Sequence, residues 1–281
     1  METVFKIDSL RQALAEGCPP EWASGWGEDR HGIFVEFTLQ EVTQRLRWMP
    51  PGRFLMGSPE NELGRDRNEG PQHEVFFLQG FWLFDTVCTQ ALWQTVMGNN
   101  PSRFQNPNRP VEQVSWLDIQ AFLARINKQV PGLELALPSE AQWEYACRAG
   151  TTTPFSFGSN ITPEQVNYNG NHPYMDGIRG NNRKKSVSVA SLPPNSWGLF
   201  EMHGNTREWC EDVWQDSYRG APMNGQAWLL SESMHQSGMG RVVRGGTWYH
   251  GARNVRSASR DYRLPDAHIN NLSFRCIRAQ T

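Results

Sequence analysis

The segment that decides the fold is Leu137-Pro138-Ser139-Glu140-Ala141-Gln142-Trp143-Glu144-Tyr145-Ala146, near the middle of a chain of 281 residues. Ser139 and Gln142 have the spacing of a capping box, in which each side chain binds the backbone N–H of the other residue. A helix is therefore predicted to begin here. It places Trp143 and Cys147 on one face and ends at Gly150, since glycine favours the left-handed conformation that closes a helix.

Two further helices are predicted upstream of this segment. Ser115 and Asp118 repeat the capping-box spacing and open one of them. Residues 89–97 carry apolar side chains at helical spacing and end at Gly98. Alternating apolar residues predict a hairpin and two more strands, over 33–39, 42–49, 75–78 and 81–84.

Downstream, the periodic signal is weaker. Residues 151–195 are rich in Asn, Gly and Pro and have hardly any periodicity, so they are predicted to form a long loop held in place by tertiary contacts or ions. Short strands are predicted over 197–202, 208–214, 241–248 and 274–279. Few residues are thus expected in regular secondary structure.

Composition excludes several classes of protein. The 27 Lys and Arg residues nearly balance 29 Asp and Glu residues, which leaves a net charge of −2. The chain therefore lacks the excess of positive charge that binding to nucleic acid requires. The 12 Trp and 25 Gly residues instead indicate a turn-rich fold held together by aromatic packing. Five cysteines, never in a C-x-x-C pair, indicate neither a disulfide framework nor a zinc ribbon.

The N-terminal residues carry no recognisable targeting signal. Residues 1–8 lack the apolar centre of a signal peptide, and no apolar run reaches the roughly 18 residues that a membrane span requires. Residues 14–18 look like a lipoprotein cleavage box, but Glu16 occupies the wrong position and no hydrophobic stretch precedes it. We therefore expect a cytoplasmic protein with reduced thiols and no membrane partner.

A series of short motifs runs in order along nearly the whole chain. They are FLMGS at 54–58, PQHEV at 71–75, VMG at 96–98, NPS at 100–102, PVEQVSW at 110–116, LPSEAQWEYA at 137–146, PPN at 193–195, WGL at 197–199, GN at 204–205, EW at 208–209, RGG at 244–246 and FR at 274–275. The series resembles the formylglycine-generating-enzyme (sulfatase-modifying factor) family. The resemblance implies one α+β domain over residues 1–281, a C-type-lectin-like fold elaborated as in those enzymes.

The catalytic groups of that superfamily are missing from this sequence. The resemblance implies that oxidases of the family bind copper through two cysteines between the RGG and FR motifs. Here residues 247–273 contain no cysteine, and Cys276 follows the FR motif as a single thiol. The H-x-x-x-E-x-H pattern of the related iron-dependent sulfoxide synthases is also absent. We therefore expect a protein that is not an enzyme and requires no cofactor, with an oxygen-dependent oxidase as the alternative.

An acidic segment near the start of the chain also suggests catalysis at first sight. Its carboxylates are interleaved with Arg65 and Arg67, which is typical of a solvated loop rather than of an acid–base pair. It is given no functional role. The acidic residues are Glu60, Glu62, Asp66 and Glu69.

A narrower resemblance appears at residues 22–30 and 241–278, which look like the variable proteins of diversity-generating retroelements. In that group a reverse transcriptase rewrites the 3′ end of the gene at adenines, so that AAY codons for Asn become codons for many residues. Residues 241–281 are thus predicted to be a variable region. Ten positions in it hold residues that adenine changes in AAY can produce: Tyr249, His250, Gly251, Ser259, Asp261, Tyr262, Leu264, Ala267, His268 and Ile269.

The resemblance implies a recognition surface at these ten positions, with a protein as the expected partner. Aromatic rings such as Tyr249 and Tyr262 suit it, because they bury a large area at low entropic cost. Two alternatives stay open. Tyr262, Leu264 and Ile269 could be core residues, with His250 and His268 as internally bonded polar groups, and the chain could be a structural module of a larger intracellular assembly.

The family resemblance also implies structural calcium in the long loop and near the GN motif. Hard oxygen ligands stand at roughly matching positions. Asn205 and Glu208 could equally bind backbone groups in turns. The four candidate ligands are Asn167, Asp176, Asn205 and Glu208.

Overall fold

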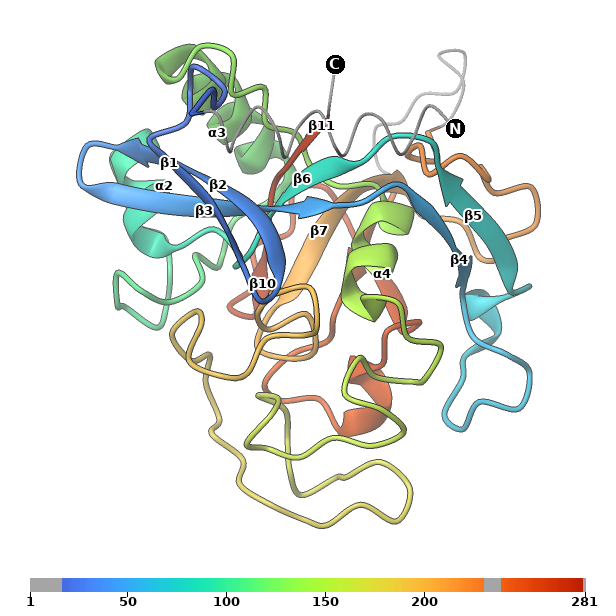
Figure 1. The fold of residues 1–281 in the computed structure, drawn as a ribbon. Helices are drawn as coiled ribbons and strands as arrows, with labels where there is room; N and C mark the ends of the chain where they lie inside the picture. Colours follow the sequence, from blue (N-terminus) through green and yellow to red (C-terminus); the bar gives the residue numbers. More distant parts are fainter. Residues whose placement is uncertain (1–16, 230–238, 280–281) are drawn as a thin grey trace.

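Strands from distant parts of the chain meet in the largest sheet of the computed structural model, which describes residues 17–229 and 239–279 (Figure 1). Its order is β1-β2-β3-β6-β11, and each neighbouring pair is antiparallel. The predicted hairpin forms β2 and β3, and the last strand, β11, lies beside β6. The strands are β1 (Gly25–Asp29), β2 (Gly32–Leu39), β3 (Val42–Met49), β6 (Phe81–Phe84) and β11 (Ile277–Ala279).

A second sheet carries the C-terminal segment that the sequence singles out. Its order is β10-β7-β8-β9, with β9 at one edge. Trp209 and Val243 pack in one core cluster, whereas Cys210 and Val242 pack in another, so apolar side chains cover both faces of β7 and β8. The strands are β7 (Arg207–Val213), β8 (Arg241–Arg244), β9 (Arg260–Arg263) and β10 (Leu272–Ser273).

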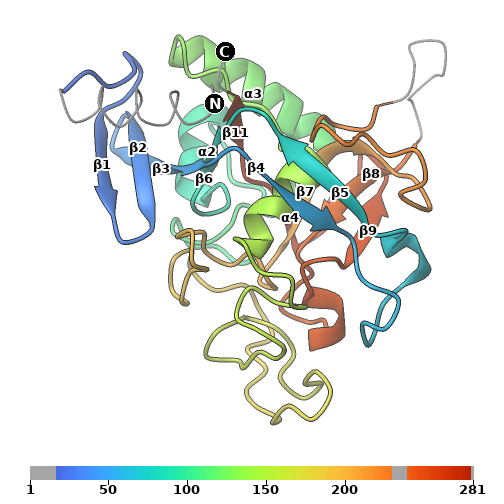
Figure 2. The same ribbon diagram turned by 45° about the vertical axis from the view of Figure 1, so that its right-hand side comes forward.

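The α-helices of the described chain begin at side-chain caps, which were predicted at Ser115 and Ser139 but not at Thr89. The hydroxyls of Thr89, Ser115 and Ser139 each accept a hydrogen bond from the backbone N–H three residues further on. Helix α4 lies between the β4–β5 ribbon and β7 (Figure 2). The elements are α2 (Gln90–Met97), α3 (Trp116–Gln129), α4 (Glu140–Arg148), β4 (Gly52–Met56), β5 (His73–Phe77) and the short 3-10 helices η1 (Arg67–Glu69) and η2 (Ala252–Val255).

Aromatic rings fill the core, as the composition indicates. Trp93 stacks on Phe122 with ring centroids 5.3 Å apart, and Phe274 meets both rings edge-on. Trp143 and Trp209 are also fully buried. These rings link α2 and α3 to the C-terminal segment, so packing across the whole chain length stabilises the fold.

Parts of the predicted strand pattern are wrong for backbone reasons. Residues 197–202 form turns instead of a strand, because the Asn195 side chain accepts the N–H groups of Trp197 and Leu199 and the backbone φ of Gly198 is +77°. Strand β8 ends at Arg244 instead of reaching residue 248, since Gly245 follows in the left-handed region. Residues 274–276 precede β11 without strand pairing, and β1, β4, β9 and β10 were not predicted.

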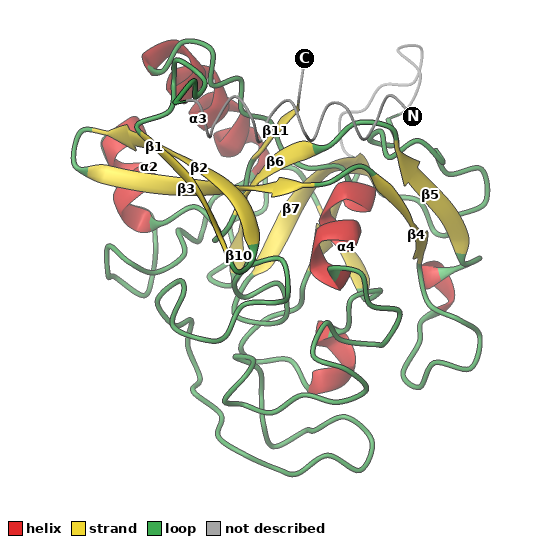
Figure 3. Ribbon diagram, viewed as in Figure 1, coloured by secondary structure: helices red, strands yellow, loops and turns green. Residues whose placement is uncertain are grey.

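The long loop over residues 151–195 is confirmed and contains no helix or strand (Figure 3). Tertiary contacts hold it in place. Phe155, Tyr168 and Tyr174 pack in a cluster with Ala252 and Val255 of η2. The loop therefore supports the C-terminal segment from below in Figure 3.

The predictions about targeting segments are tested only in part. Residues 1–16 lie outside the described residues, as do 230–238 and 280–281. Within the described ranges, no helix combines the length and the apolar character needed to cross a membrane.

The acidic segment was predicted to be solvated, and for two of its carboxylates that prediction is wrong. Glu69 is fully buried, and its Oε1 lies 2.6 Å from Nη2 of Arg256. The same guanidinium contacts the carboxylate of Glu62. Burial alone would raise the pKa of Glu69, but the hydrogen bonds and charge of Arg256 hold it below its ordinary value. Glu60, by contrast, is exposed.

Replacing Glu69 with Gln is expected to reduce the free energy of unfolding by about 3 kcal/mol, because it removes the main counter-charge of a buried guanidinium. Glu60→Gln is the matched control, with an expected change within about 0.5 kcal/mol. Urea unfolding measures both. Since the pKa of Glu69 is lowered in the folded protein, the advantage of the wild type should be complete above the ordinary pKa of glutamate and shrink as the pH falls. Equal losses for both variants would contradict the burial of this carboxylate.

Candidate functional site

Buried arginines attach the C-terminal segment to the rest of the molecule. Arg244 on β8 lies 2.8 Å from Glu140 and 2.6 Å from Glu144, both on α4. Arg260 on β9 binds both carboxylate oxygens of Glu140 at 2.7 Å. Although burial disfavours the charge of Arg244, the neighbouring carboxylates hold its pKa above the ordinary value. Together with Arg256, these side chains fix the backbone of the segment.

The register of β8 and β9 places two of the predicted variable positions on opposite faces of the sheet. Tyr262 lies opposite Val242, and Asp261 lies opposite Val243. Residues paired across antiparallel strands point to the same side of the sheet, and neighbours along a strand point to opposite sides. Tyr262 and Asp261 therefore belong to different faces of the edge strand.

The ten predicted variable residues are exposed or half-buried without exception. The exposed fractions of Tyr249, Tyr262 and Leu264 are 48%, 45% and 51%. The core alternative is therefore wrong for Tyr262 and Leu264, whereas Ile269 is half-buried and packs partly against the core. His250 and His268 are internally bonded, as that alternative held, at 3.0 Å to the Thr247 hydroxyl and 2.8 Å to the Asp118 carboxylate. By contrast, six of the eleven residues that lie between these positions are buried: Ala252, Val255, Arg256, Ser257, Ala258 and Arg260. Leu272, Phe274 and Arg275, which follow Ile269, are buried as well.

One group of these residues surrounds Arg207, at the start of β7. Its guanidinium lies 2.7 Å from the Asp261 carboxylate, which also lies 3.0 Å from Arg263. The rings of Tyr249 and His250 lie 4.3 Å apart beside them. Burial and the charge of Arg207 lower the pKa of His250 to about 3, so this imidazole is neutral at pH 7. Two cations and one carboxylate leave this group with a positive charge.

A second group lies on Tyr262 and the turn after β9. The ring of Tyr262 packs on Trp214 at a centroid distance of 5.0 Å. Further on, Nε2 of His268 lies 2.8 Å from Oδ2 of Asp118, the capping-box residue of α3. The segment is thus attached to the N-terminus of α3 while Leu264 stays exposed.

Two of the predicted variable positions, His250 and Gly251, contact the long loop. The backbone carbonyl of His250 accepts a hydrogen bond from the N–H of Asn169. A Cβ on Gly251 would lie 2.9 Å from Cβ of His172. A larger residue at position 251 therefore requires a shift of the loop.

The predicted calcium ligands fit a metal only in part. Glu208 is fully buried and binds Arg275 with both carboxylate oxygens, at 2.6 and 2.8 Å. Asn167 and Asn205 join their side chains at 3.0 Å, and Oδ1 of Asn167 has no hydrogen-bond partner among the described residues. Asp176 is exposed. The structure therefore makes Glu208 the counter-ion of Arg275, and calcium at the Asn167–Asn205 pair stays a prediction.

The four buried thiols are poor nucleophiles, because a nucleophilic cysteine reacts as its thiolate. Burial raises the pKa of each of them, that of Cys147 to about 12, so they are protonated at neutral pH. Cys147 lies 3.7 Å from Nε2 of His203, but burial also lowers the pKa of that imidazole to about 4. No thiolate–imidazolium pair can form there near pH 7. The buried cysteines are Cys88, Cys147, Cys210 and Cys276.

Several residues that contact the predicted variable positions could not be found from the sequence. Arg207 lies 54 positions before Asp261 in the chain, and Trp214 and Asp118 come from other elements. None of them carries a local motif that points to the C-terminal segment. Their part in the site depends on the fold alone.

Comparison with known proteins supports the architecture. The family model described as "Sulfatase-modifying factor enzyme 1-like domain" matches residues 35–280. The formylglycine-generating enzyme of Bos taurus is 31% identical over 198 residues, which cover 66% of this chain and 48% of that protein. The chain spans about half the length of the mammalian relatives it matches.

Two solved structures share the fold. PvdO from Pseudomonas aeruginosa has a TM-score of 0.72 at 26% identity and covers 93% of this chain and 100% of its own. Treponema denticola variable protein 1 has a TM-score of 0.72 at 23% identity and covers 88% of this chain and 99% of its own. The predicted α+β, C-type-lectin-like fold is confirmed by these similarities together with the observed sheets and helices.

Tyr262→Ala is expected to lower the free energy of unfolding by about 1 kcal/mol, because the ring is half-exposed and loses one aromatic contact. Phe274→Ala, in the same segment but fully buried, should cost about 3 to 5 kcal/mol. Urea denaturation of the two variants gives the comparison. A loss at Tyr262 as large as that at Phe274 would return Tyr262 to the core.

Glu208→Gln is expected to destabilise the protein by about 3 to 5 kcal/mol, since Arg275 then keeps a buried charge without its counter-ion. The loss should be the same in EDTA and in millimolar calcium. If Glu208 were a calcium ligand instead, the variant would lose stability in calcium and little in EDTA. Melting curves of wild type and variant in both buffers separate the two roles.

Proposed function

We propose a binding function for this chain, which belongs to the sulfatase-modifying factor enzyme 1-like domain family. It is a non-catalytic, ligand-binding protein, and its residues 241–281 form a recognition surface that a retroelement diversifies. The observation that carries the proposal is that side-chain burial differs between two sets of residues within this one segment. The ten positions singled out by the resemblance are exposed or half-buried, while six of the eleven residues between them are buried.

The buried arginines of the segment, which we call its frame, explain how the exposed side chains can be replaced without unfolding the segment. Arg244, Arg256 and Arg260 take their counter-ions from α4 and residues 62–69, outside the segment. Side chains at the ten positions can therefore change without removing these ion pairs. The fold shared with Treponema denticola variable protein 1 supports the same interpretation.

A protein is the partner that this surface suits best. Tyr249, Tyr262 and Leu264 expose aromatic and aliphatic area, and Arg263 and Asp261 supply charge in the group that contains Tyr249. Large amphipathic rings next to polar groups are typical of the centres of protein interfaces. The net charge of −2 disfavours nucleic acid. We place the protein in the cytoplasm, where its cysteines stay reduced.

An oxygen-dependent oxidase is the alternative that the relationship to formylglycine-generating enzymes favours. It would need reactive thiols. Residues 247–273 contain no cysteine, and the thiols near the core are buried and protonated. We expect no oxygen consumption above background with a cysteine-containing peptide and copper. Turnover that depends on Cys276 would support the oxidase instead.

Sequencing the DNA around the gene tests the proposed diversification. We expect a near-copy of the last hundred or so bases, with a reverse-transcriptase gene beside it. Differences between gene and copy should occur only where the copy has adenine, and should fall in the codons of the ten positions. A copy whose differences fall equally on other bases, or the absence of any copy, would contradict diversification and leave a binding protein with a fixed surface.

A further inference from the structure

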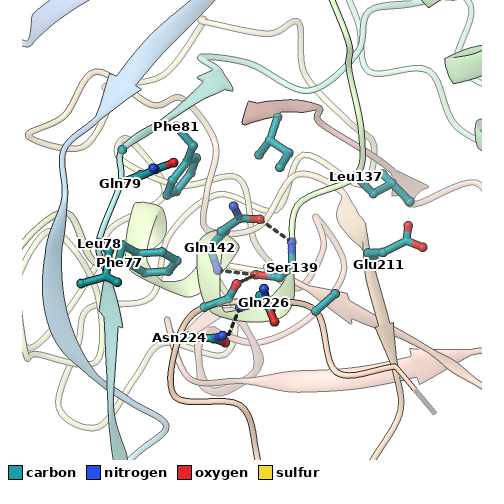
Figure 4. A pocket seen from close by; sticks show the side chains of 14 residues that line it. Phe77, Leu78, Gln79, Phe81, Leu137, Ser139, Gln142, Glu211, Asn224 and Gln226 are labelled. Carbon is teal, nitrogen blue, oxygen red and sulfur yellow. Dashed lines mark hydrogen bonds between the residues drawn. The ribbon is translucent and has the colours of Figure 1, made fainter. Parts of the chain in front are cut away.

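Two features of the molecule have no part in the proposed recognition surface: a pocket beside α4 and the tip of the long loop. The pocket has a volume of about 530 Å³ and lies next to Phe77, Phe81 and the N-terminal end of α4 (Figure 4). The charged residue in its lining, Glu211, points away from the apolar side chains, and Arg241 compensates its charge. The pocket therefore does not select a ligand by charge, whereas the loop tip carries charge of mainly one sign.

The tip of the long loop, which we define as residues 171–185, is a protrusion held by hydrogen bonds. It belongs to the yellow segment that forms the lowest part of the molecule in Figures 1 and 2, opposite α3 and β11. The N–H of Gly180 donates to the carbonyl of Gly170 at 2.9 Å and closes the loop. The Tyr174 hydroxyl donates to the carbonyl of Leu63 at 2.6 Å, and the Tyr174 ring packs on Phe155. The tip is therefore the part of this side that meets a flat surface first.

Two apolar side chains of the tip are left in water. Among the exposed large apolar residues of the described chain, Ile178 has the highest exposed fraction, 85%, and that of Met175 is 60%. The N–H of Gly177 donates to the carbonyl of Tyr174 at 2.8 Å and closes the turn that contains Met175 and leads into Ile178. Neither apolar side chain belongs to a core cluster of the described residues. Their transfer out of water would therefore be a free-energy gain that folding leaves unused.

Positive charge accompanies these two side chains. The charged residues of the tip are four cations and one carboxylate: Arg179, Arg183, Lys184, Lys185 and Asp176. The tip thus has a net charge of 4 − 1 = +3, in a chain whose net charge is −2. Arg179, Lys184 and Lys185 form no salt bridge with the carboxylates that the structure describes. Glu164 lies near Arg183, and counting it still leaves 3 − 1 = +2.

We propose that the loop tip docks on an anionic lipid surface. Ile178 and Met175 enter the boundary between headgroups and acyl chains, and the cations lie against the charged headgroups. A bilayer has an apolar layer directly beneath a negatively charged one, so it satisfies both kinds of side chain at once. An acidic patch on a protein would compensate the cations and leave Ile178 in water. Independent of the function proposed for the C-terminal segment, the proposal replaces the expectation of no membrane partner, because a loop that rests on a bilayer needs no spanning helix.

Vesicle co-sedimentation of the full chain measures the docking, with phosphatidylcholine vesicles that contain either about 30% phosphatidylserine or none. We expect the Kd to be about 100-fold lower with phosphatidylserine at ~0.1 M salt, and to rise with added salt. Lys184→Gln combined with Lys185→Gln should raise it about 25-fold, since each cation near such a surface contributes about a factor of five. Arg125→Gln combined with Lys128→Gln removes the same charge from exposed positions of α3 and should leave it nearly unchanged. Asp176→Asn should lower it about fivefold.

Ile178→Ser tests the apolar contact and should raise the Kd about tenfold, whereas Leu117→Ser, at an exposed apolar residue of α3, should not change it. Melting curves check that each variant folds. Tyr262→Ala should leave vesicle binding unchanged, so a failure of the recognition surface and a failure of this proposal are separate results. Equal binding to both kinds of vesicle, or equal losses in the two double variants, would overturn the proposal. Binding to soluble polyglutamate as tight as to the charged vesicles, with no loss in Ile178→Ser, would overturn it in favour of an acidic protein.

Discussion

The ion pairs of Arg244 with Glu140 and Glu144 are the interaction on which the rest of this structure depends. They join β8 to α4 in a region from which solvent is excluded. Removing one partner of such a pair leaves a charge without compensation, at a cost of about 3 to 5 kcal/mol. Because the planar guanidinium binds in a fixed geometry, the pairs also fix the position of the second sheet against the helix.

Because buried ion pairs hold the backbone of the C-terminal segment, its exposed side chains are not needed to keep it in place. Arg256 and Arg260 continue the same arrangement toward residues 62–69 and α4, while the aromatic packing of Phe274 holds the end of the segment. The exposed positions then carry little of the folding energy. A rigid frame with a changeable surface suits recognition, and buried, protonated thiols do not suit oxidation.

Local chemistry was predictable from the sequence, and contacts between distant residues were not. The caps at Ser115 and Ser139 depend on neighbouring residues, so the helices were found where expected. The turns over residues 197–202 depend on the Asn195 side chain and on left-handed backbone, which alternation of apolar residues conceals. Glu69 pairs with Arg256, 187 positions away, so its burial had no sequence signal. The ten predicted variable positions were inferred from the resemblance and from the residues that adenine changes in AAY can produce, and only Asp261 and Tyr262 among them lie in the paired register of β8 and β9.

The most direct test of this account is a library in which all ten positions are randomised at once, with the codons that adenine changes in AAY can produce. The quantity to measure is the fraction of its members that fold. Protease resistance of a displayed library measures it, against a second library randomised at seven buried positions of the same C-terminal segment, Arg256 and Phe274 among them. We predict that most members of the first library resist the protease and almost none of the second do. Similar resistance in the two libraries, or general loss of folding in the first, would contradict the separation of frame and surface.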